Sequence, residues 1–171
     1  MLDELTVKCE AGDYVKYSAT FKGKKMTSES EPAISFLTEN AFLGKHVVVK
    51  FADTEAGLAG ATPVSVDNVE FTINKNLLDW QALGDEDVNS IFNQQFTVAW
   101  NFEALFADET LLDYVKDSTK KFMKIEIINT EVTIGSGNPE VSFIFGKVSF
   151  DEWDCLSPLN DWTNLKNQFS H

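Results

Sequence analysis

The sequence contains no arginine, only two cysteines, only two histidines and no long apolar run. Its fourteen basic residues are all lysines and are outnumbered by 27 acidic residues, so the formal net charge is −13. Proteins that bind nucleic acid need Lys and Arg to neutralise phosphates, so this balance excludes tight nucleic-acid binding. No apolar run approaches the ~18 residues that a membrane-spanning helix needs, so we expect no such span.

The shortage of Cys and His limits the chemistry that the chain can perform. Cys9 and Cys155 are too few for a disulfide scaffold, so we expect two reduced and at least half-buried thiols. His46 precedes an apolar triplet and is interpreted as a strand-end residue rather than a catalyst, whereas His171 is terminal. No Cys/His spacing suits zinc, and we predict neither metal nor cofactor.

Size and composition predict one globular domain over residues 1–171, within which residues 154–171 are hard to assign. The first ten residues hold no basic segment followed by an apolar run, so we expect a soluble protein made in a cytoplasm. The charge is uneven. Residues 1–50 hold seven Lys and seven acids, whereas residues 51–171 hold seven Lys and twenty acids and so carry all of the excess.

Alternation of apolar and polar residues predicts a mainly β, antiparallel fold. The alternation over residues 5–9 and 15–21, with Gly12-Asp13 between, predicts a hairpin. Further apolar faces are predicted at residues 47–51 and 69–73. The longest alternating run is QFTVAWNFEALF, residues 95–106, in which six apolar side chains point one way. Later strands are predicted from KFMKIEIINTEVTI, where Met123, Ile125 and Ile127 share a face, from VSFIFGKVSF, covered on both faces, and at residues 162–169.

Two segments depart from the alternating pattern. DETLLDYVKDSTKKF predicts a short amphipathic helix capped by Asp108, with Lys120 and Lys121 near its C-terminus. GDEDVNSIFNQ, which starts at Gly84, is interpreted as a second helical turn. Residues 22–45 form a long irregular segment, and loops of this length usually have a function. Its apolar residues need a partner surface; they are Met26, Ile34, Phe36, Leu37, Phe42 and Leu43.

Motifs for catalysis are weak. The stretch from Gly57 to Gly60 lacks the Gly-Lys-Ser/Thr that ends a phosphate-binding loop. Asp85, Asp87 and Asn89 mimic the start of a calcium loop, but the Gly and Glu that such a loop requires are missing. The acids of residues 151–154 around Trp153 could mimic a glycosidase pair, yet acids are so common here that chance accounts for them. We therefore predict that the chain is not an enzyme.

Several segments in order resemble the major tail tube proteins of long-tailed bacteriophages and prophages. They are VKCEAGDYVKYSATFKGKK (7–25), VVVKFADTEAGLAGATPVSVDNVEFTINKN (47–76), NQQFTVAWNFEALF (93–106), LLDYVKDSTKK (111–121), KIEIINTEVTIGSGNPEVSF (124–143) and VSFDEWD (148–154). The resemblance covers roughly residues 5–155. Members of that family are typically longer at the N-terminus and continue further after the Phe-x-x-Trp region, so we expect either a divergent short member or a product that lacks part of the fold.

The resemblance implies a β-sandwich or partial barrel with a flanking helix, in the tail of a virion and made in a bacterial host cytoplasm. Copies would form stacked, six-fold rings, and the partners of the chain would be further copies and other tail proteins. Their inner strands would join into a barrel through which double-stranded DNA passes without specific binding. Some acids of residues 67–109 would then line a negative lumen that repels phosphate, although acidity that merely keeps the subunit soluble explains them equally well.

The resemblance also suggests where copies meet. The segment 22–45 would reach the neighbouring ring through the six apolar residues named above. The stretch FADTEAGLAGATP would allow close approach between copies at Ala56, Gly57, Leu58 and Gly60, although it could equally be an ordinary solvated loop. The alternative function is an acidic β-sandwich that binds a ligand or carbohydrate, with Trp80, Trp153 and Trp162 as stacking platforms.

Overall fold

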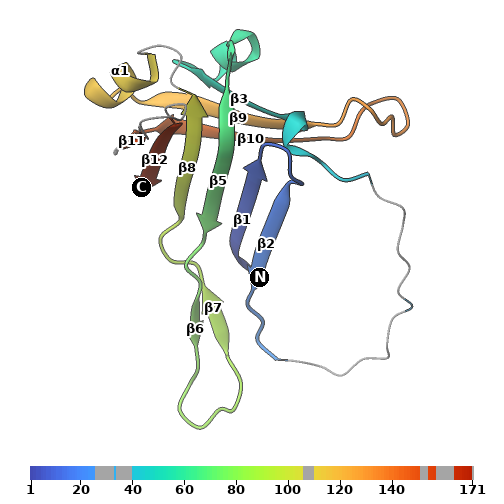
Figure 1. The fold of residues 1–171 in the computed structure, drawn as a ribbon. Coiled ribbons are helices and arrows are strands. Elements are labelled where there is room, and N and C mark those ends of the chain that lie inside the picture. The colour runs from blue at the N-terminus through green and yellow to red at the C-terminus, as the bar shows by residue number, and fades with distance from the viewer. Residues whose placement is uncertain (26–32, 34–39, 106–109, 151–153, 157–163, 171) are drawn as a thin grey trace.

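The computed structural model describes residues 1–25, 33, 40–105, 110–150, 154–156 and 164–170. Its strands pair antiparallel throughout this part of the chain, and one short α-helix flanks them (Figure 1). The elements in chain order are β1 Leu2–Glu10, β2 Lys16–Phe21, η1 Gly44–His46, β3 Val47–Ala52, η2 Ala56–Gly60, β4 Pro63–Val64, β5 Val66–Asn74, β6 Leu78–Trp80, β7 Ser90–Phe92, β8 Thr97–Leu105, α1 Thr110–Lys116, β9 Lys121–Ile128, β10 Glu140–Val148, β11 Asp154–Leu156 and β12 Asn164–Ser170.

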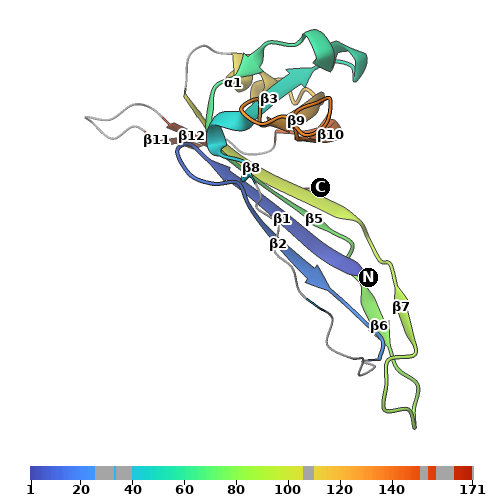
Figure 2. The same ribbon diagram turned by 90° about the vertical axis from the view of Figure 1, so that its right-hand side faces the viewer.

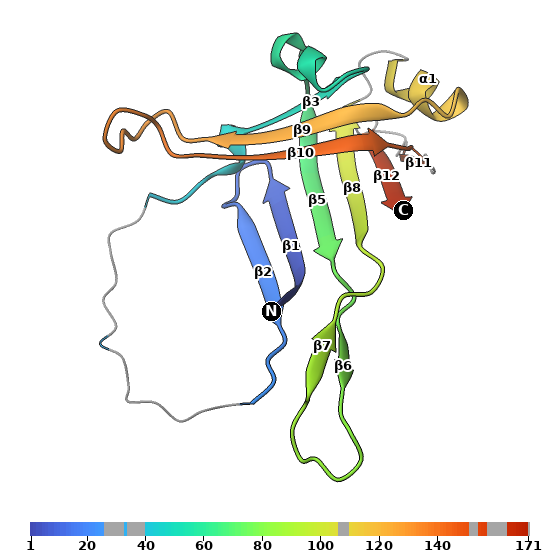
Figure 3. The same cartoon turned by 180° about the vertical axis from the view of Figure 1, so that it is seen from behind.

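Two sheets form the body of the molecule, and the strands of one cross the strands of the other (Figures 1 and 3). The larger sheet has six strands in the order β11-β12-β8-β5-β1-β2, and the smaller has four in the order β10-β9-β3-β4. The described strands therefore make an open sandwich and not a closed barrel. A separate ribbon, β6 and β7, continues beyond the end of β5 and β8, on the side away from the smaller sheet (Figure 2).

The period-2 alternation explains the core, because every second side chain of the larger sheet points at the smaller one. Val69 and Phe71 of β5 are each 1% exposed, and the β8 residue Phe102 is 2% exposed. On the smaller sheet, the core residues Val49 and Ile125 are both fully buried. The predicted apolar faces of residues 5–9, 47–51, 69–73 and 123–127 are therefore confirmed as the core faces of β1, β3, β5 and β9.

Aromatic rings occupy the space where the sheets cross. The ring centroids of Trp100 and Phe145 lie 4.1 Å apart, and those of Phe71 and Phe143 lie 4.7 Å apart, both edge-on. In a second group, the ring centroid of Phe51 lies 5.9 Å from that of Phe102 and 5.5 Å from that of Phe150, with the rings tilted. Aromatic pairs add to the free energy gained by burying the rings, so these contacts help to hold the two sheets together.

Several sequence predictions are confirmed in outline. The hairpin of residues 5–21 is β1 and β2, the long alternating run contains β8, and the tail strand is β12. The amphipathic helix is α1, whose Leu111 is buried, but it ends at Lys116 and Lys121 already begins β9. The predicted cap, Asp108, lies outside the described residues.

Two sequence predictions are wrong. Residues 84–94 form no helical turn; they contain the bend and second strand of the β6–β7 ribbon, because turn-forming residues join two short pairing segments there. Strand β10 is not covered on both faces, since Val141 is 42% and Ile144 is 48% exposed. The reason is that Ile144 lies on the side of the smaller sheet that points away from the core, where it pairs with Lys124, whereas its neighbour Phe143 pairs with the core residue Ile125.

Candidate functional site

The outer face of the larger sheet is polar across four strands. The register of the strands places polar residues side by side. Lys8 of β1 pairs with Lys16 of β2 and with Glu70 of β5, and Glu70 pairs with Asn101 of β8. Apart from Ala99, every described side chain of this face on β2, β1, β5 and β8 is polar or charged. We call this set the polar face: Lys16, Ser18, Thr20, Glu4, Thr6, Lys8, Glu10, Asn68, Glu70, Thr72, Asn74, Thr97, Ala99, Asn101 and Glu103.

Hydrogen bonds between strands order the polar face. The Asn68 amide donates to a Glu103 carboxylate oxygen at 2.7 Å, and the Asn74 amide donates to Glu4 at 2.8 Å. The hydroxyls of Thr6 and Thr72 lie 2.9 Å apart. Because each bond joins adjacent strands, the side chains are held in a fixed layer, and cross-strand pairs of this kind stabilise the sheet.

The charge of the polar face is negative. It carries four carboxylates, Glu4, Glu10, Glu70 and Glu103, against two lysines. One lysine is neutralised locally, since the Lys8 ammonium lies 2.8 Å from Glu10, and this contact raises the pKa of Lys8. Carboxylates only accept hydrogen bonds and repel anions, so this face disfavours contact with phosphate.

Strand β2 leaves an open edge beside the polar face. In the described part of the chain it pairs only with β1, and all six of its residues are exposed. Tyr17 is 80% and Phe21 is 70% exposed, although both lie on the same side of the sheet as the core. An unpaired edge with exposed aromatic side chains is a template for pairing with another strand.

The predicted interface residues of the long segment are only partly described. Met26, Ile34, Phe36 and Leu37 lie outside the described residues.

The two others, Phe42 and Leu43, are half-buried. Phe42 packs against the core, and its carbonyl accepts a 2.9 Å bond from the Val15 amide. Leu43 bridges to Tyr14, so this end of the segment is anchored beside the hairpin. Their role between copies stays a prediction.

The Gly- and Ala-rich stretch forms the 3-10 helix η2 rather than an irregular loop. Leu58 is 2% exposed, so its side chain is already covered by its own chain. Ala56, Gly57 and Gly60 are exposed, and nothing lies within 4 Å of the position that a Cβ on Gly60 would take. The role of the exposed residues between copies also stays a prediction.

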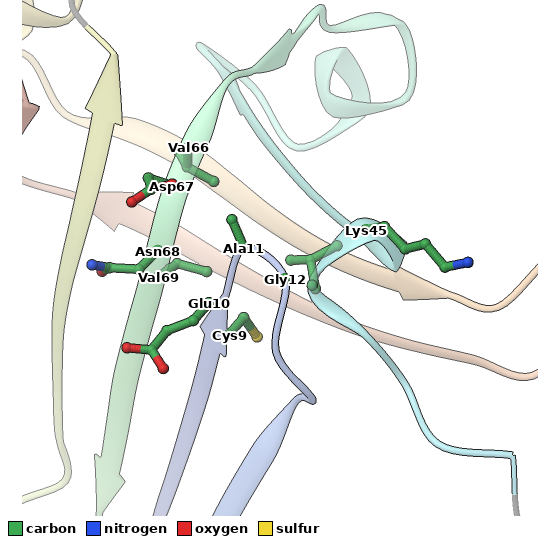
Figure 4. A pocket seen from close by; sticks show the side chains of 11 residues that line it. Cys9, Glu10, Ala11, Gly12, Lys45, Val66, Asp67, Asn68 and Val69 are labelled. Carbon is green, nitrogen blue, oxygen red and sulfur yellow. The ribbon is translucent and has the colours of Figure 1, made fainter. Parts of the chain in front are cut away.

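A pocket of about 300 Å³ lies where the β1–β2 turn meets the start of β5 (Figure 4). Its lining includes Cys9, Glu10, Gly44, Lys45 and Asp67. Cys9 is 3% exposed and is a free thiol, and burial raises its pKa to about 11. The thiolate is the nucleophilic form, so Cys9 is an inert packing residue at neutral pH.

The other residues considered for chemistry are placed in structural roles or lie outside the described part. His46 is buried in η1, and its Nδ1 accepts a 3.1 Å bond from the Leu43 amide. Asp87 pairs with Lys25 at 2.8 Å, and the Asn89 amide donates to Asp85 at 2.6 Å. Asp151, Glu152 and Trp153 lie outside the described residues.

Among the described residues, no three His, Cys, Asp or Glu side chains gather as metal ligands. Trp80 is 50% exposed on the β6–β7 ribbon, while the side chains of Trp153 and Trp162 are not among those described. No helix in the described structure has the length and apolarity to span a membrane.

The described chain is thus an open antiparallel β-sandwich with an ordered polar face and an unpaired edge strand. The chain belongs to the phage tail tube protein family, whose model matches residues 1–160. A search of curated proteins found no match. Membership implies a structural component of the virion tail that assembles with copies of itself and with other tail proteins.

The site could be predicted from the sequence only in part. The strands were evident from alternation, and Glu70 and Glu103 fall within the predicted acidic range 67–109. The contribution of β1, with Glu4 and Glu10, was missed. The signal was present in the Glu-x-Thr-x-Lys-x-Glu spacing of residues 4–10, which places these side chains on the side opposite the core.

Proposed function

We propose that this chain is the repeating subunit of a tail tube, in which copies self-associate into stacked hexameric rings around a negatively lined conduit for DNA ejection. The observation that carries the proposal is the polar face, which is ordered, net negative and opposite to the core. The hexameric number comes from the family resemblance. The subunit carries out no catalysis and needs no cofactor. It resides in the virion tail after synthesis in the host cytoplasm.

The open edge supports ring formation. The larger sheet ends in β2 on one side and in β11 on the other, so a copy can offer one edge to each of two neighbours. A contact between two different edges is head-to-tail, and such contacts close into rings when the rotation allows it. Joining the sheets in this way would remove the exposed edge of β2 and continue the polar face from copy to copy.

The polar face explains how DNA would pass without binding. Proteins that hold DNA neutralise phosphates with Lys and Arg, whereas this face places Glu4, Glu70 and Glu103 in an ordered layer. Repulsion keeps the polyanion away from the wall, so the DNA slides instead of sticking. Two further acids of residues 67–109, Asp85 and Asp87, lie in the bend between β6 and β7 and are not part of the polar face.

Negative-stain electron microscopy of the concentrated, purified chain, with mass photometry on the same sample, tests assembly. We expect rings or tubes with a central channel. A chain that remains monomeric even when tail-tip initiator proteins are added would contradict the proposal.

The lumen is tested by charge reversal on the polar face. Glu70→Lys changes the wall charge by two units per copy, so its tubes should retain double-stranded DNA in a low-salt pelleting assay, while wild-type tubes should not. The matched control is Asp113→Lys, which makes the same charge change on α1, where the wild-type side chain is 56% exposed. Equal DNA retention by the two variants would place the polar face outside the lumen.

A further inference from the structure

An apolar trough lies beside the free edge of β10. It has a volume of about 590 Å³, and its floor is formed by Ile73, Val98 and Trp100 of the larger sheet. Phe143, Ile144 and Phe145 of β10 also line it, as does Phe96, which comes just before β8. The trough exists because the smaller sheet covers only part of the larger one, so the apolar alternation of β5 and β8 continues past the region that β10 shields (Figure 3).

A second apolar surface projects from the same chain. In the β6–β7 ribbon, Leu78 pairs with Phe92, and Trp80 lies two residues from Leu78 on the same side. The exposed fractions are 47% for Leu78, 53% for Phe92 and 50% for Trp80. A two-stranded ribbon is at best marginally stable in water, so a ribbon with one apolar face requires a partner.

The ribbon points away from the trough of its own copy. The β6–β7 ribbon continues beyond the ends of β5 and β8, on the side away from the smaller sheet (Figures 1 and 2), whereas the trough is lined by β10 of that sheet. A ribbon that keeps this direction is therefore available to the trough of another copy. Such a contact joins two different patches and is head-to-tail, which is the type that builds rings and tubes.

Charge favours this pairing. Residues 77–94 contain four acids and no lysine. Asp79 and Asp87 lie 3.7 Å and 2.8 Å from Lys22 and Lys25, so the negative charge of the ribbon comes mainly from Asp85 and Glu86 in its bend. The trough lining contains a single charged residue, Lys147, which is exposed at its rim. An acidic ribbon and a trough with only a positive charge attract each other over short range and oppose wrong orientations.

We propose that the β6–β7 ribbon of one copy docks in the trough beside β10 of a second copy, with Trp80 and Phe92 as the buried anchors. This contact rests on the proposed tail tube function and adds a defined apolar joint to the edge-to-edge pairing of the larger sheets. Aromatic anchors that fill an apolar pocket dominate the affinity of most protein interfaces. It would also cover part of Ile144, which lines the trough and is 48% exposed.

The first experiment is cysteine cross-linking between separately purified full-length variants. All variants carry Cys155→Ser, and Cys9 stays because it is buried. Phe92→Cys is mixed with Ile144→Cys, assembled and oxidised, and intermolecular dimers are quantified on a non-reducing gel. The matched control replaces Phe92→Cys with Asp79→Cys, which lies on the other side of the ribbon. Dimers should form with the first pair and be several times fewer with the control.

The second experiment measures the concentration at which assembly begins. Trp80→Ala should raise it about tenfold or more, the effect typical of truncating an aromatic anchor. Ile134→Ala is the control, because Ile134 is similarly apolar and 66% exposed but belongs to neither surface. Circular dichroism shows whether each variant is folded, and the cross-linking result does not depend on Trp80.

The outcomes separate the two proposals. Wild-type tubes together with selective cross-linking support the ribbon–trough contact. Wild-type tubes in which the two cysteine pairs cross-link equally, or not at all, overturn the contact but leave the tail tube function standing. A wild-type chain that stays monomeric with initiator present overturns the function and, with it, the contact.

Discussion

Phe71 is the residue at which the two-sheet architecture is most directly testable. It is 1% exposed, and its ring lies 4.7 Å from Phe143, 5.4 Å from Phe145 and 6.5 Å from Trp100 between ring centroids. Phe143 and Phe145 belong to the smaller sheet, whereas Trp100 belongs to the larger one. Phe71→Ala would therefore leave a cavity at the point where the sheets are joined.

The magnitude follows from the burial. Truncating a fully buried Phe to Ala costs about 3–5 kcal/mol of unfolding free energy, because transfer from water and cavity formation both contribute. Lost edge-on ring contacts place this site in the upper half of that range, about 4 kcal/mol. For a domain of this size, each kcal/mol lowers Tm by about 2–4 °C, so Tm should fall by roughly 8–16 °C.

The assay is urea unfolding followed by tryptophan fluorescence, with calorimetry for Tm. The matched control is Tyr17→Ala, also an aromatic truncation on the core side of the larger sheet, but at a position that is 80% exposed. It should change the unfolding free energy of the monomer by no more than about 0.5 kcal/mol. A Phe71→Ala loss below about 1 kcal/mol, or equal losses in both variants, would refute the packing described here.

Two further predictions concern the region around the pocket of Figure 4. A Cβ on Gly44 would lie 2.1 Å from the backbone oxygen of Glu10, so Gly44→Ala should cost about 1–3 kcal/mol in urea unfolding, while Gly60→Ala, with open space around it, should be close to neutral. The raised pKa of Cys9, about 11 against an ordinary 9.0, means that the folded protein favours the neutral thiol. The contribution of the Cys9 thiol to the unfolding free energy is therefore complete below pH 9 and is lost as the pH rises from 9 towards 11. In a Cys155→Ser background, the unfolding free energy should therefore fall less between pH 9 and 11 when Cys9 is also changed to Ala, and an identical fall would contradict this.

Strands and their core faces could be predicted from the sequence where one side of the strand is buried and the other is exposed to solvent. In β5 the apolar residues 69, 71 and 73 alternate with polar ones, and the structure places Phe71 in the core and Glu70 on the polar face. The same logic located β8 and the core face of β9. Period 2 identifies these elements because a slip of one residue would turn every apolar side chain into water.

Prediction failed where burial depends on how the sheets stack. Strand β10 is apolar on both sides, a pattern typical of a strand covered twice, yet in the described structure Ile144, on its outward side, is 48% exposed. No local pattern encodes which side is covered, because the stacking of sheets results from long-range contacts. The β6–β7 ribbon was missed because its strands have three residues each, too few to show a period.

The polar face also shows how stability and wall chemistry are separated along the chain. Even-numbered residues of β1 from Glu4 on and of β5 from Asn68 on, and odd-numbered residues of β8 up to Glu103, point away from the core. Their neighbours in sequence hold the sandwich together. A designer could therefore rewrite the inside of such a nanotube, for example from anionic to neutral or cationic, at alternate positions on three strands while leaving the packing residues unchanged. The limit on such rewriting is set by the few cross-strand pairs, such as Asn68 with Glu103, whose two members would have to be exchanged together.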